Sequence, residues 1–105
     1  MQLTSFLQEG KLTIVLTGEI DHHKAKEYIR IITSKIEAYN PRTCILDFEE
    51  VTFMDSSGIA VVINALRQLN KMDATLTLSG IQNQPMKVFR TSGVDRWVEI
   101  KEKVL

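Results

Sequence analysis

The sequence predicts an α/β fold in which a mostly parallel or mixed β-sheet of four to five strands packs against helices. Short apolar segments typical of strands alternate with longer segments that repeat apolar residues at helical spacing, in the order β-β-α-β-α-β-α-β. Strands joined through helices need right-handed crossovers, which bring the strands into one sheet. At 105 residues, the chain is expected to form a single domain over residues 1–105.

Two strands are expected at the start of the chain. Residues 3–7 make a weak first strand, and Glu9-Gly10 makes a turn. The second strand, residues 12–20, alternates apolar and polar side chains, as a half-buried strand does. Gly18 near its end indicates either a bend or a close approach of another part of the backbone.

A long helix should follow. Asp21 suits its N-cap, because a carboxylate accepts hydrogen bonds from the free N–H groups of a first helical turn. Asn40-Pro41 should end the helix, since proline cannot continue it. Its expected inward face consists of Ala25, Ile29, Ile32, Ile36 and Tyr39.

The centre of the chain predicts a buried strand that leads into a second helix. Residues 44–48 are apolar and partly β-branched, which favours a strand buried on both faces. Between the strand and the helix lies Asp55-Ser56-Ser57-Gly58, whose carboxylate and hydroxyls suit a helix cap, and whose glycine permits a close approach. The expected apolar face of the helix is Ile59, Val62, Ile63, Leu66 and Leu69.

The remaining segments are short. Residues 74–78 predict a fourth strand, and Pro85 fits the first turn of a short helix that carries Met86, Val88 and Phe89. Gly93 suits a left-handed helix end. Residues 97–100 predict a last strand, and residues 101–105 a solvated tail.

Composition excludes several classes of protein. Thirteen basic and thirteen acidic residues cancel, which argues against direct nucleic-acid binding. There is no apolar run near the length of a membrane span and no signal peptide, so no membrane association is expected. The single cysteine, Cys44, fits a reducing compartment, and we expect a cytoplasmic protein.

The motifs of common enzymes are missing. Met54 stands where a nucleophile elbow needs glycine, and no Walker-type phosphate loop occurs. The only histidines, His22 and His23, point about 100° apart on a helix, which does not suit one metal ion. Glu49 and Glu50 are interpreted as solvated loop charges. We therefore expect no enzyme activity, no cofactor and no metal site.

Two interpretations of Asp55-Ser56-Ser57-Gly58 stay open on these grounds. The segment is either a helix cap alone or an exposed docking site, because it presents two hydroxyls within an apolar surround. Asp21 has the same two interpretations. If the strands before both caps are parallel neighbours, the two loops open on one edge of the sheet, where α/β folds place their sites.

Three blocks of the sequence resemble the STAS domain of bacterial anti-sigma factor antagonists. They are Thr17-Gly18-Glu19-Ile20-Asp21, Ile45-Leu46-Asp47-Phe48 and the segment from Val51 to Ile59 that contains Asp55-Ser56-Ser57-Gly58. The likeness extends over residues 3–100, and Asp21-His22-His23 favours the sporulation members that act in sigma F control. The resemblance implies a STAS-type mixed sheet with helices packed against it.

The resemblance also implies a phosphorylation switch. In such proteins the serine after the motif aspartate, here Ser56, is phosphorylated by an anti-sigma factor that is a serine kinase, and a PPM-type serine phosphatase reverses the modification. Ser57 is the fallback phosphorylation site. The unphosphorylated form binds the kinase and releases the sigma factor. The implied partner surface is Asp21, Asp55, Ser56, Ser57, Gly58 and Ile59.

The sequence departs from the family pattern in two places. Ile59-Ala60 stands where many members have Leu-Gly, and the chain stops at Leu105, where longer members carry another helix. We therefore expect a monomer or weak homodimer. Two alternatives remain. The first is a STAS adaptor in a transport or stress-signalling assembly that is not controlled by phosphorylation. The second is a nucleotide-binding enzyme that uses the helix N-terminus for phosphate, and the absence of a Walker lysine and of a base from the sequence argues against it.

Overall fold

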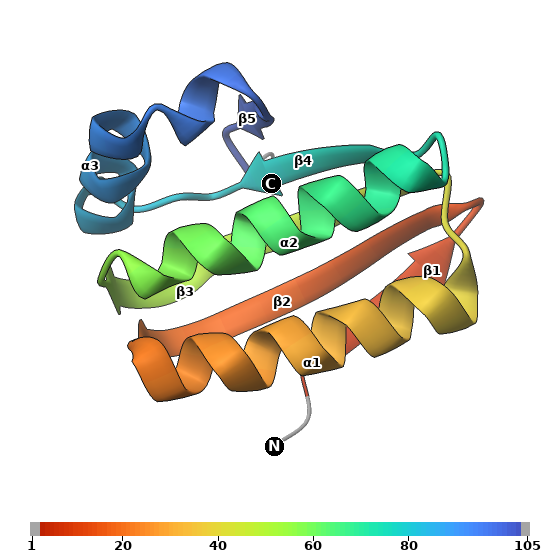
Figure 1. Cartoon of the computed structure of the whole chain (residues 1–105), viewed down its shortest axis with the longest axis horizontal. Helices are drawn as coiled ribbons and strands as arrows, with labels where there is room; N and C mark the ends of the chain where they lie inside the picture. Colours follow the sequence, from red (N-terminus) through yellow and green to blue (C-terminus); the bar gives the residue numbers. More distant parts are fainter. Residues whose placement is uncertain (1–2, 104–105) are drawn as a thin grey trace.

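A computed structural model describes residues 3–103 and shows a five-stranded sheet with three α-helices, in the element order predicted from the sequence (Figure 1). The elements are β1 (Thr4–Gln8), β2 (Lys11–Ile20), α1 (His22–Tyr39), β3 (Thr43–Met54), α2 (Ser57–Lys71), β4 (Thr75–Ser79), α3 (Asn83–Ser92), the 3₁₀ turn η1 (Val94–Arg96) and β5 (Glu99–Lys101).

The sheet is mixed, as expected. Its spatial order is β1-β2-β3-β4-β5, with β1 antiparallel to β2 and every other pair parallel. The register of β2 against β3 shifts twice, once after Val15 and once between Gly18 and Glu19. Gly18 has φ +76° and would have open space around a Cβ. It therefore marks a bend in the strand, and the alternative of a close backbone approach is wrong.

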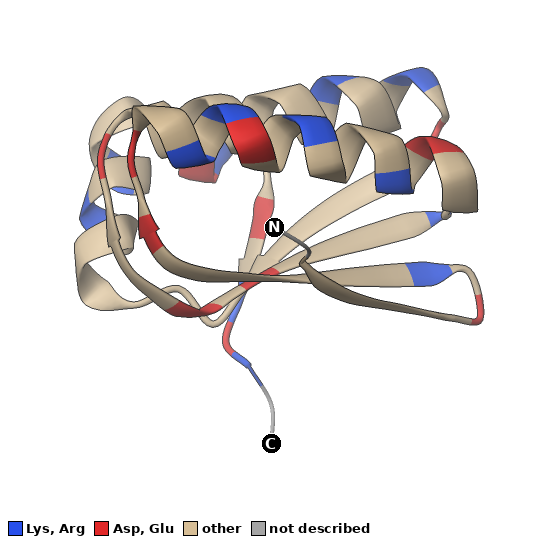
Figure 2. Cartoon of the chain, turned by 90° about the horizontal axis from the view of Figure 1, so that it is seen from below, with Lys and Arg blue, Asp and Glu red and all other residues tan. Residues whose placement is uncertain are grey.

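Helices α1 and α2 lie side by side on one face of the sheet (Figure 2). The alternation in β2 explains this layering, because Leu12, Ile14 and Leu16 are fully buried while Thr13 and Val15 are only half-buried. In β3 the side chains of Cys44, Leu46 and Phe48 continue the same buried layer. The opposite face of the sheet carries mainly polar and half-buried side chains.

The inward faces of both long helices differ from the prediction. In α1 the expected Tyr39 is 47% exposed, because it lies at the helix end just before the left-handed turn at Asn40. Tyr28 is buried instead, and its hydroxyl donates to the carbonyl oxygen of Thr17 over 2.9 Å. In α2 the small residues turn toward the sheet and the larger Ile59, Ile63 and Leu66 are half-buried. The buried residues of α2 are Gly58, Val61, Val62, Ala65 and Leu69.

Three predictions about shorter segments are corrected. Strand β3 continues to Met54, so Glu49 and Glu50 lie in a strand and not in a loop. The last strand begins at Glu99, because residues 94–96 form a 3₁₀ turn that leaves Trp97 76% exposed. Residues 101–103 are exposed as expected, but Lys101 ends β5 and Lys103 pairs with Asp47 and Glu49; Val104 and Leu105 lie outside the described residues.

Candidate helix-terminus docking site

The two predicted caps lie at the same edge of the sheet. Ile20 and Met54 are register partners at the ends of β2 and β3, and the N–H of Asp55 donates to the carbonyl oxygen of Ile20 over 3.1 Å. Because the two strands are parallel neighbours, α1 and α2 both begin at this edge, on the left in Figure 1. The segments that start with Asp21 and with Asp55 are thus brought together.

Asp55 is the residue that caps α2. Its Oδ1 accepts a hydrogen bond from the N–H of Ser57 over 2.8 Å. Ser56 already has helical φ and ψ angles of −63° and −17°, and its side chain makes no capping hydrogen bond. The expectation that aspartate and serine share the capping role is therefore corrected. Ser56 presents an exposed hydroxyl beside the positive end of a helix dipole, whereas Ser57 is half-buried.

Gly58 is required by the protein's own core. A Cβ at this position would overlap the Sδ and Cγ atoms of Met54, which is fully buried beneath the start of α2. The close approach that the sequence indicated is therefore made by Met54 and not by a partner. Residue 58 is buried, so its contribution to a surface is the position it allows α2 to take.

Asp21 caps α1 as predicted. Its Oδ1 accepts from the N–H of Lys24 over 2.9 Å, and this hydrogen bond lowers the pKa of the Asp21 carboxyl below 3.8. The charge of His23 adds a smaller effect in the same direction. The imidazole rings of His22 and His23 meet edge to face with centroids 6.0 Å apart.

Among residues 3–103, no group of three or more His, Cys, Asp or Glu side chains could hold a metal ion. Burial raises the pKa of the Cys44 thiol to about 12, so this cysteine is not a nucleophile at neutral pH. No helix in that stretch is long and apolar enough to cross a membrane.

A groove lies directly beside Ser56. It has a volume of ≈ 320 Å³ and runs between the first turn of α2 and one side of α3. Sequence reasoning identified Ser56 and Ile59 but missed the α3 wall, because those residues form no motif and only the fold places them here. The lining residues are Ser56, Ile59, Lys87, Val88, Thr91 and Ser92.

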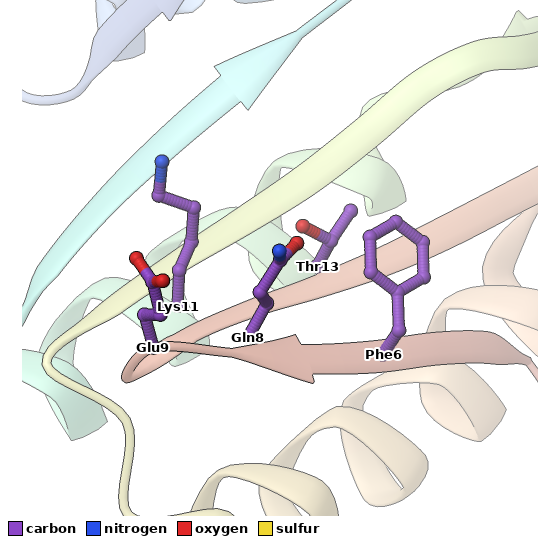
Figure 3. A pocket seen from close by; sticks show the side chains of 5 residues that line it. All are labelled: Phe6, Gln8, Glu9, Lys11 and Thr13. Atoms are coloured by element: carbon purple, nitrogen blue, oxygen red, sulfur yellow. The ribbon is translucent and has the colours of Figure 1, made fainter.

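A second hollow lies at the opposite end of β2, over the turn that joins it to β1 (Figure 3). Its side chains rise from the sheet face that the helices leave open. Phe6 is 55% exposed there, and Glu9 and Lys11 are exposed charges. The hollow therefore lacks the buried polar group that usually orients a ligand. Its lining residues are Phe6, Gln8, Glu9, Lys11 and Thr13.

Comparison with known proteins shows to which family this chain is related. The STAS domain pattern matches residues 7–104. The anti-sigma F factor antagonist of Lysinibacillus sphaericus is 32% identical over 87 residues, which cover 83% of this chain and 74% of that protein. The anti-sigma-B factor antagonist of Listeria monocytogenes is 29% identical over 93 residues, covering 86% and 78%.

Solved structures agree with this relationship. The anti-sigma factor antagonist SpoIIAA in its unphosphorylated form superimposes with a TM-score of 0.83 at 28% identity, covering 98% of this chain and 89% of that one. The phosphorylated form of the same Bacillus protein gives 0.75 at 28% identity, covering 98% and 92%. The fold, the cap motif and the relatives together show that this chain belongs to the STAS domain family.

Proposed function

We propose that this protein is an anti-sigma factor antagonist whose unphosphorylated form binds an anti-sigma factor serine kinase and thereby releases a sigma factor. Phosphorylation of Ser56 ends that binding, and a PPM-type serine phosphatase restores it. The protein acts as a regulatory binding partner and not as an enzyme. The observation that carries the proposal is the exposed hydroxyl of Ser56, which takes no part in capping α2.

Ser56 suits a kinase better than Ser57 does. A kinase must surround the acceptor hydroxyl, and the side chain of Ser57 is half-buried in the first turn of α2. The N–H of Ser57 is also bound to Asp55, which holds this residue in the helix. Ser57 therefore remains the fallback site only.

The groove supports the docking part of the proposal. Ile59 and Val88 supply an apolar lining directly beside Ser56, and Lys87 adds one cation at the rim. A partner side chain seated there would bring its neighbours against the start of α2. We include in the proposed partner surface the residues Asp21, Asp55, Ser56, Ser57 and Ile59, with Gly58 as the residue that sets the position of α2.

Phosphorylation can switch such a surface without unfolding it. A phosphate adds about −1.5 to −2 charges, which the helix N-terminus tolerates. The neighbouring carboxylates of Asp55 and Asp21 and a desolvated partner surface oppose that charge, and Figure 2 shows acidic residues at these strand ends. A docking penalty of ~3–4 kcal/mol would weaken binding some hundreds-fold.

The test uses a purified anti-sigma factor serine kinase, with ATP. We expect the kinase to phosphorylate the parent and Ser57→Ala, and to leave Ser56→Ala unlabelled. We expect Ser56→Asp to bind the kinase at least a hundredfold more weakly than the parent, with Ser56→Asn as the matched uncharged control. Labelling of Ser56→Ala, or parent-like binding of Ser56→Asp, would overturn the proposal. Capture of transporter subunits without any kinase would favour the adaptor alternative instead.

A further inference from the structure

Half of β3 lacks a neighbouring strand on one side. Strand β4 pairs with β3 only from Thr43 to Asp47, whereas β3 continues to Met54. The backbone groups of the continuing segment that point away from β2 therefore have no strand to bond with. Such groups need another hydrogen-bond partner wherever water is excluded.

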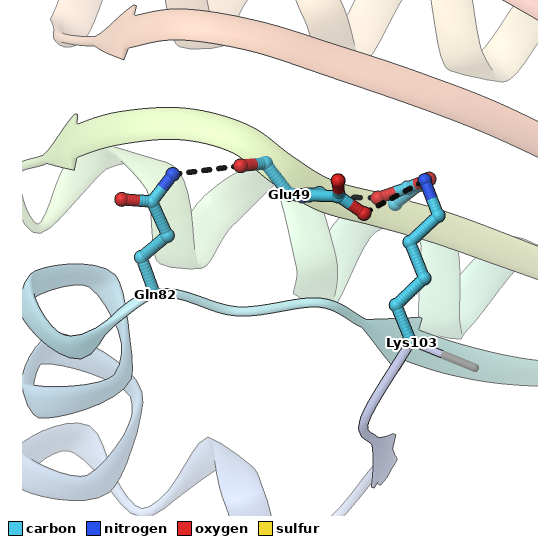
Figure 4. A network of polar contacts seen from close by, with 4 residues as sticks. Glu49, Gln82 and Lys103 are labelled. Carbon is cyan, nitrogen blue, oxygen red and sulfur yellow. Dashed lines mark hydrogen bonds and ion pairs between the residues drawn. The ribbon is translucent and has the colours of Figure 1, made fainter. Parts of the chain in front are cut away.

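Two glutamine side chains take the place of the absent strand. Gln82, directly before α3, donates through Nε2 to the carbonyl oxygen of Glu49 over 2.7 Å (Figure 4). Gln84, in the first turn of α3, bonds Met54 twice: its Oε1 accepts from the Met54 N–H over 2.8 Å, and its Nε2 donates to the Met54 carbonyl oxygen over 2.9 Å. A carboxamide offers the same donor and acceptor pair that a strand residue would.

The reciprocal pair lies two residues before Ser56. Met54 also fills the space beneath Gly58, and Asp55 is bound to Ile20 of β2. The segment that carries Ser56 is thus held by β2 on one side and by Gln84 on the other. Gln84 and Val88 are four residues apart on α3, so the side chain that bonds Met54 comes from the same helix face that lines the groove beside Ser56.

We propose that Gln84 is a positioning residue for Ser56, which holds the acceptor hydroxyl and the α3 wall of the groove in the arrangement that the kinase recognises. This inference rests on the proposed function, since it concerns how that hydroxyl is presented. Gln82 makes a single bond farther from Ser56 and serves as the natural comparison.

The first test replaces Gln84 by methionine, which has a similar length but no hydrogen-bonding amide. We expect Gln84→Met to speed hydrogen exchange of the Met54 N–H at least tenfold in NMR, and to lower kcat/KM for phosphorylation about tenfold. We expect Gln82→Met to leave both quantities at the parent values. Parent-like exchange or parent-like kinetics in Gln84→Met, or an equal effect of Gln82→Met, would overturn the proposal.

The second test compares the Gln84→Glu variant with the parent as a function of pH. In Gln84→Glu, the new carboxyl group has a donor and an acceptor only while it is protonated, so it can replace the amide below about pH 4 and not at neutral pH. At neutral pH the carboxylate still accepts from the Met54 N–H but leaves the Met54 carbonyl oxygen without a donor, so we expect the free energy of unfolding of Gln84→Glu to be parent-like near pH 4 and below that of the parent near pH 7. The difference in the free energy of unfolding between Gln84→Met and the parent should not change over this pH range, and a pH-independent difference between Gln84→Glu and the parent would contradict the inference.

Hydrogen exchange is read without a kinase, so the two proposals fail separately. If the kinase does not phosphorylate the parent, the proposed function is wrong whatever the exchange data show. If the parent is phosphorylated and the exchange at Met54 is insensitive to Gln84, the positioning role alone is wrong.

Discussion

The N–H of Asp55 donates to the carbonyl oxygen of Ile20 over 3.1 Å, which joins the end of β3 to the end of β2. Each of these residues stands two positions before the first residue of a helix, because α1 starts at His22 and α2 at Ser57. The parallel pairing of β2 with β3, which ends at this bond, places two acidic caps and the Ser56 hydroxyl on the same edge of the sheet. The candidate site is therefore a property of strand register more than of any single side chain.

Gly58→Ala should destabilise the protein by about 1–3 kcal/mol, although alanine normally favours a helix interior. The reason is the overlap between the new Cβ and the buried Met54 side chain. Urea unfolding would measure the change. In a Met54→Ala background the same substitution should cost little, because the clashing atoms are gone, and a full penalty there would contradict the packing explanation.

Tyr28→Phe should lower the free energy of unfolding by about 0.5–1.5 kcal/mol, because the buried ring would lose its hydrogen bond to the Thr17 carbonyl oxygen. That carbonyl lies beside the bend at Gly18, so the bond also braces the irregular part of β2. Denaturant unfolding gives the measurement. Tyr39→Phe is the matched control, since Tyr39 is 47% exposed and its loss of hydroxyl should change nothing measurable.

Lys103→Met should lower Tm at low salt and by less in 1 M NaCl. The Lys103 Nζ atom lies 2.8 Å from Oδ2 of Asp47 and 2.9 Å from Oε2 of Glu49, and the Asp47 side chain is only 6% exposed (Figure 4). Lys101→Met is the control, because its ion pair with Glu99 is 3.7 Å long and well exposed. Equal Tm losses for both lysines would contradict this prediction.

The stability that the ion pairs of Lys103 contribute should depend on pH in a predictable way. Hydrogen bonds to Asp47 and then to Glu49 raise the pKa of Lys103 above 10.5. A group whose pKa is raised by folding contributes its stability fully below the unfolded value and loses it only as pH rises through the folded value. The Tm difference between the parent and Lys103→Met should therefore stay constant from pH 8 up to 10.5. If this Tm difference became smaller below pH 10.5, the titration of a group other than Lys103 would be responsible for the change.

Asp21→Ala should show the opposite pH dependence. The hydrogen bond from Lys24 N–H lowers the pKa of Asp21 below 3.8, so its charge-dependent stabilisation is present above that value and is lost as pH falls through the lower, folded pKa. Thermal melts should show a constant Tm gap above about pH 5 that narrows below pH 3.8. Asp21→Asn keeps an acceptor for the cap but loses the charge, so its Tm at neutral pH should lie between those of the parent and of Asp21→Ala.

Local patterns predicted most of the fold correctly. The alternation in β2, the aspartate caps and the left-handed Gly93, with φ +81°, all act within a few residues, so a linear sequence is enough to find them. Errors arose where long-range packing decided the outcome. Tyr39 has the right spacing to face inward, but it is the last residue of α1, directly before the left-handed Asn40, and its side chain stays 47% exposed.

The candidate site was predicted in part for the same reason. Asp55 and Ser56 indicate a helix start within one motif. Which of the two side chains caps α2 depends on the backbone conformation between β3 and α2, which the motif does not specify. The α3 side of the groove, with Lys87 and Val88, lies about thirty residues farther along, and the pattern that predicts a helix there does not indicate that it lies beside Ser56. Gln84 likewise has no signal in the sequence, because its partner is a backbone group.

By itself, the sequence determined the strands, the helices, their order and the segment where a hydroxyl follows an aspartate, since periodicity and capping depend on neighbours along the chain. Only the tertiary structure decided that Ser56 is the free hydroxyl, that Asp21 shares its edge and that Gln84 holds the loop. These are contacts between residues far apart in sequence. These contacts arise from the register of β2 against β3 and from the short length of β4, which pairs with only part of β3. No local stretch of the sequence specifies either feature.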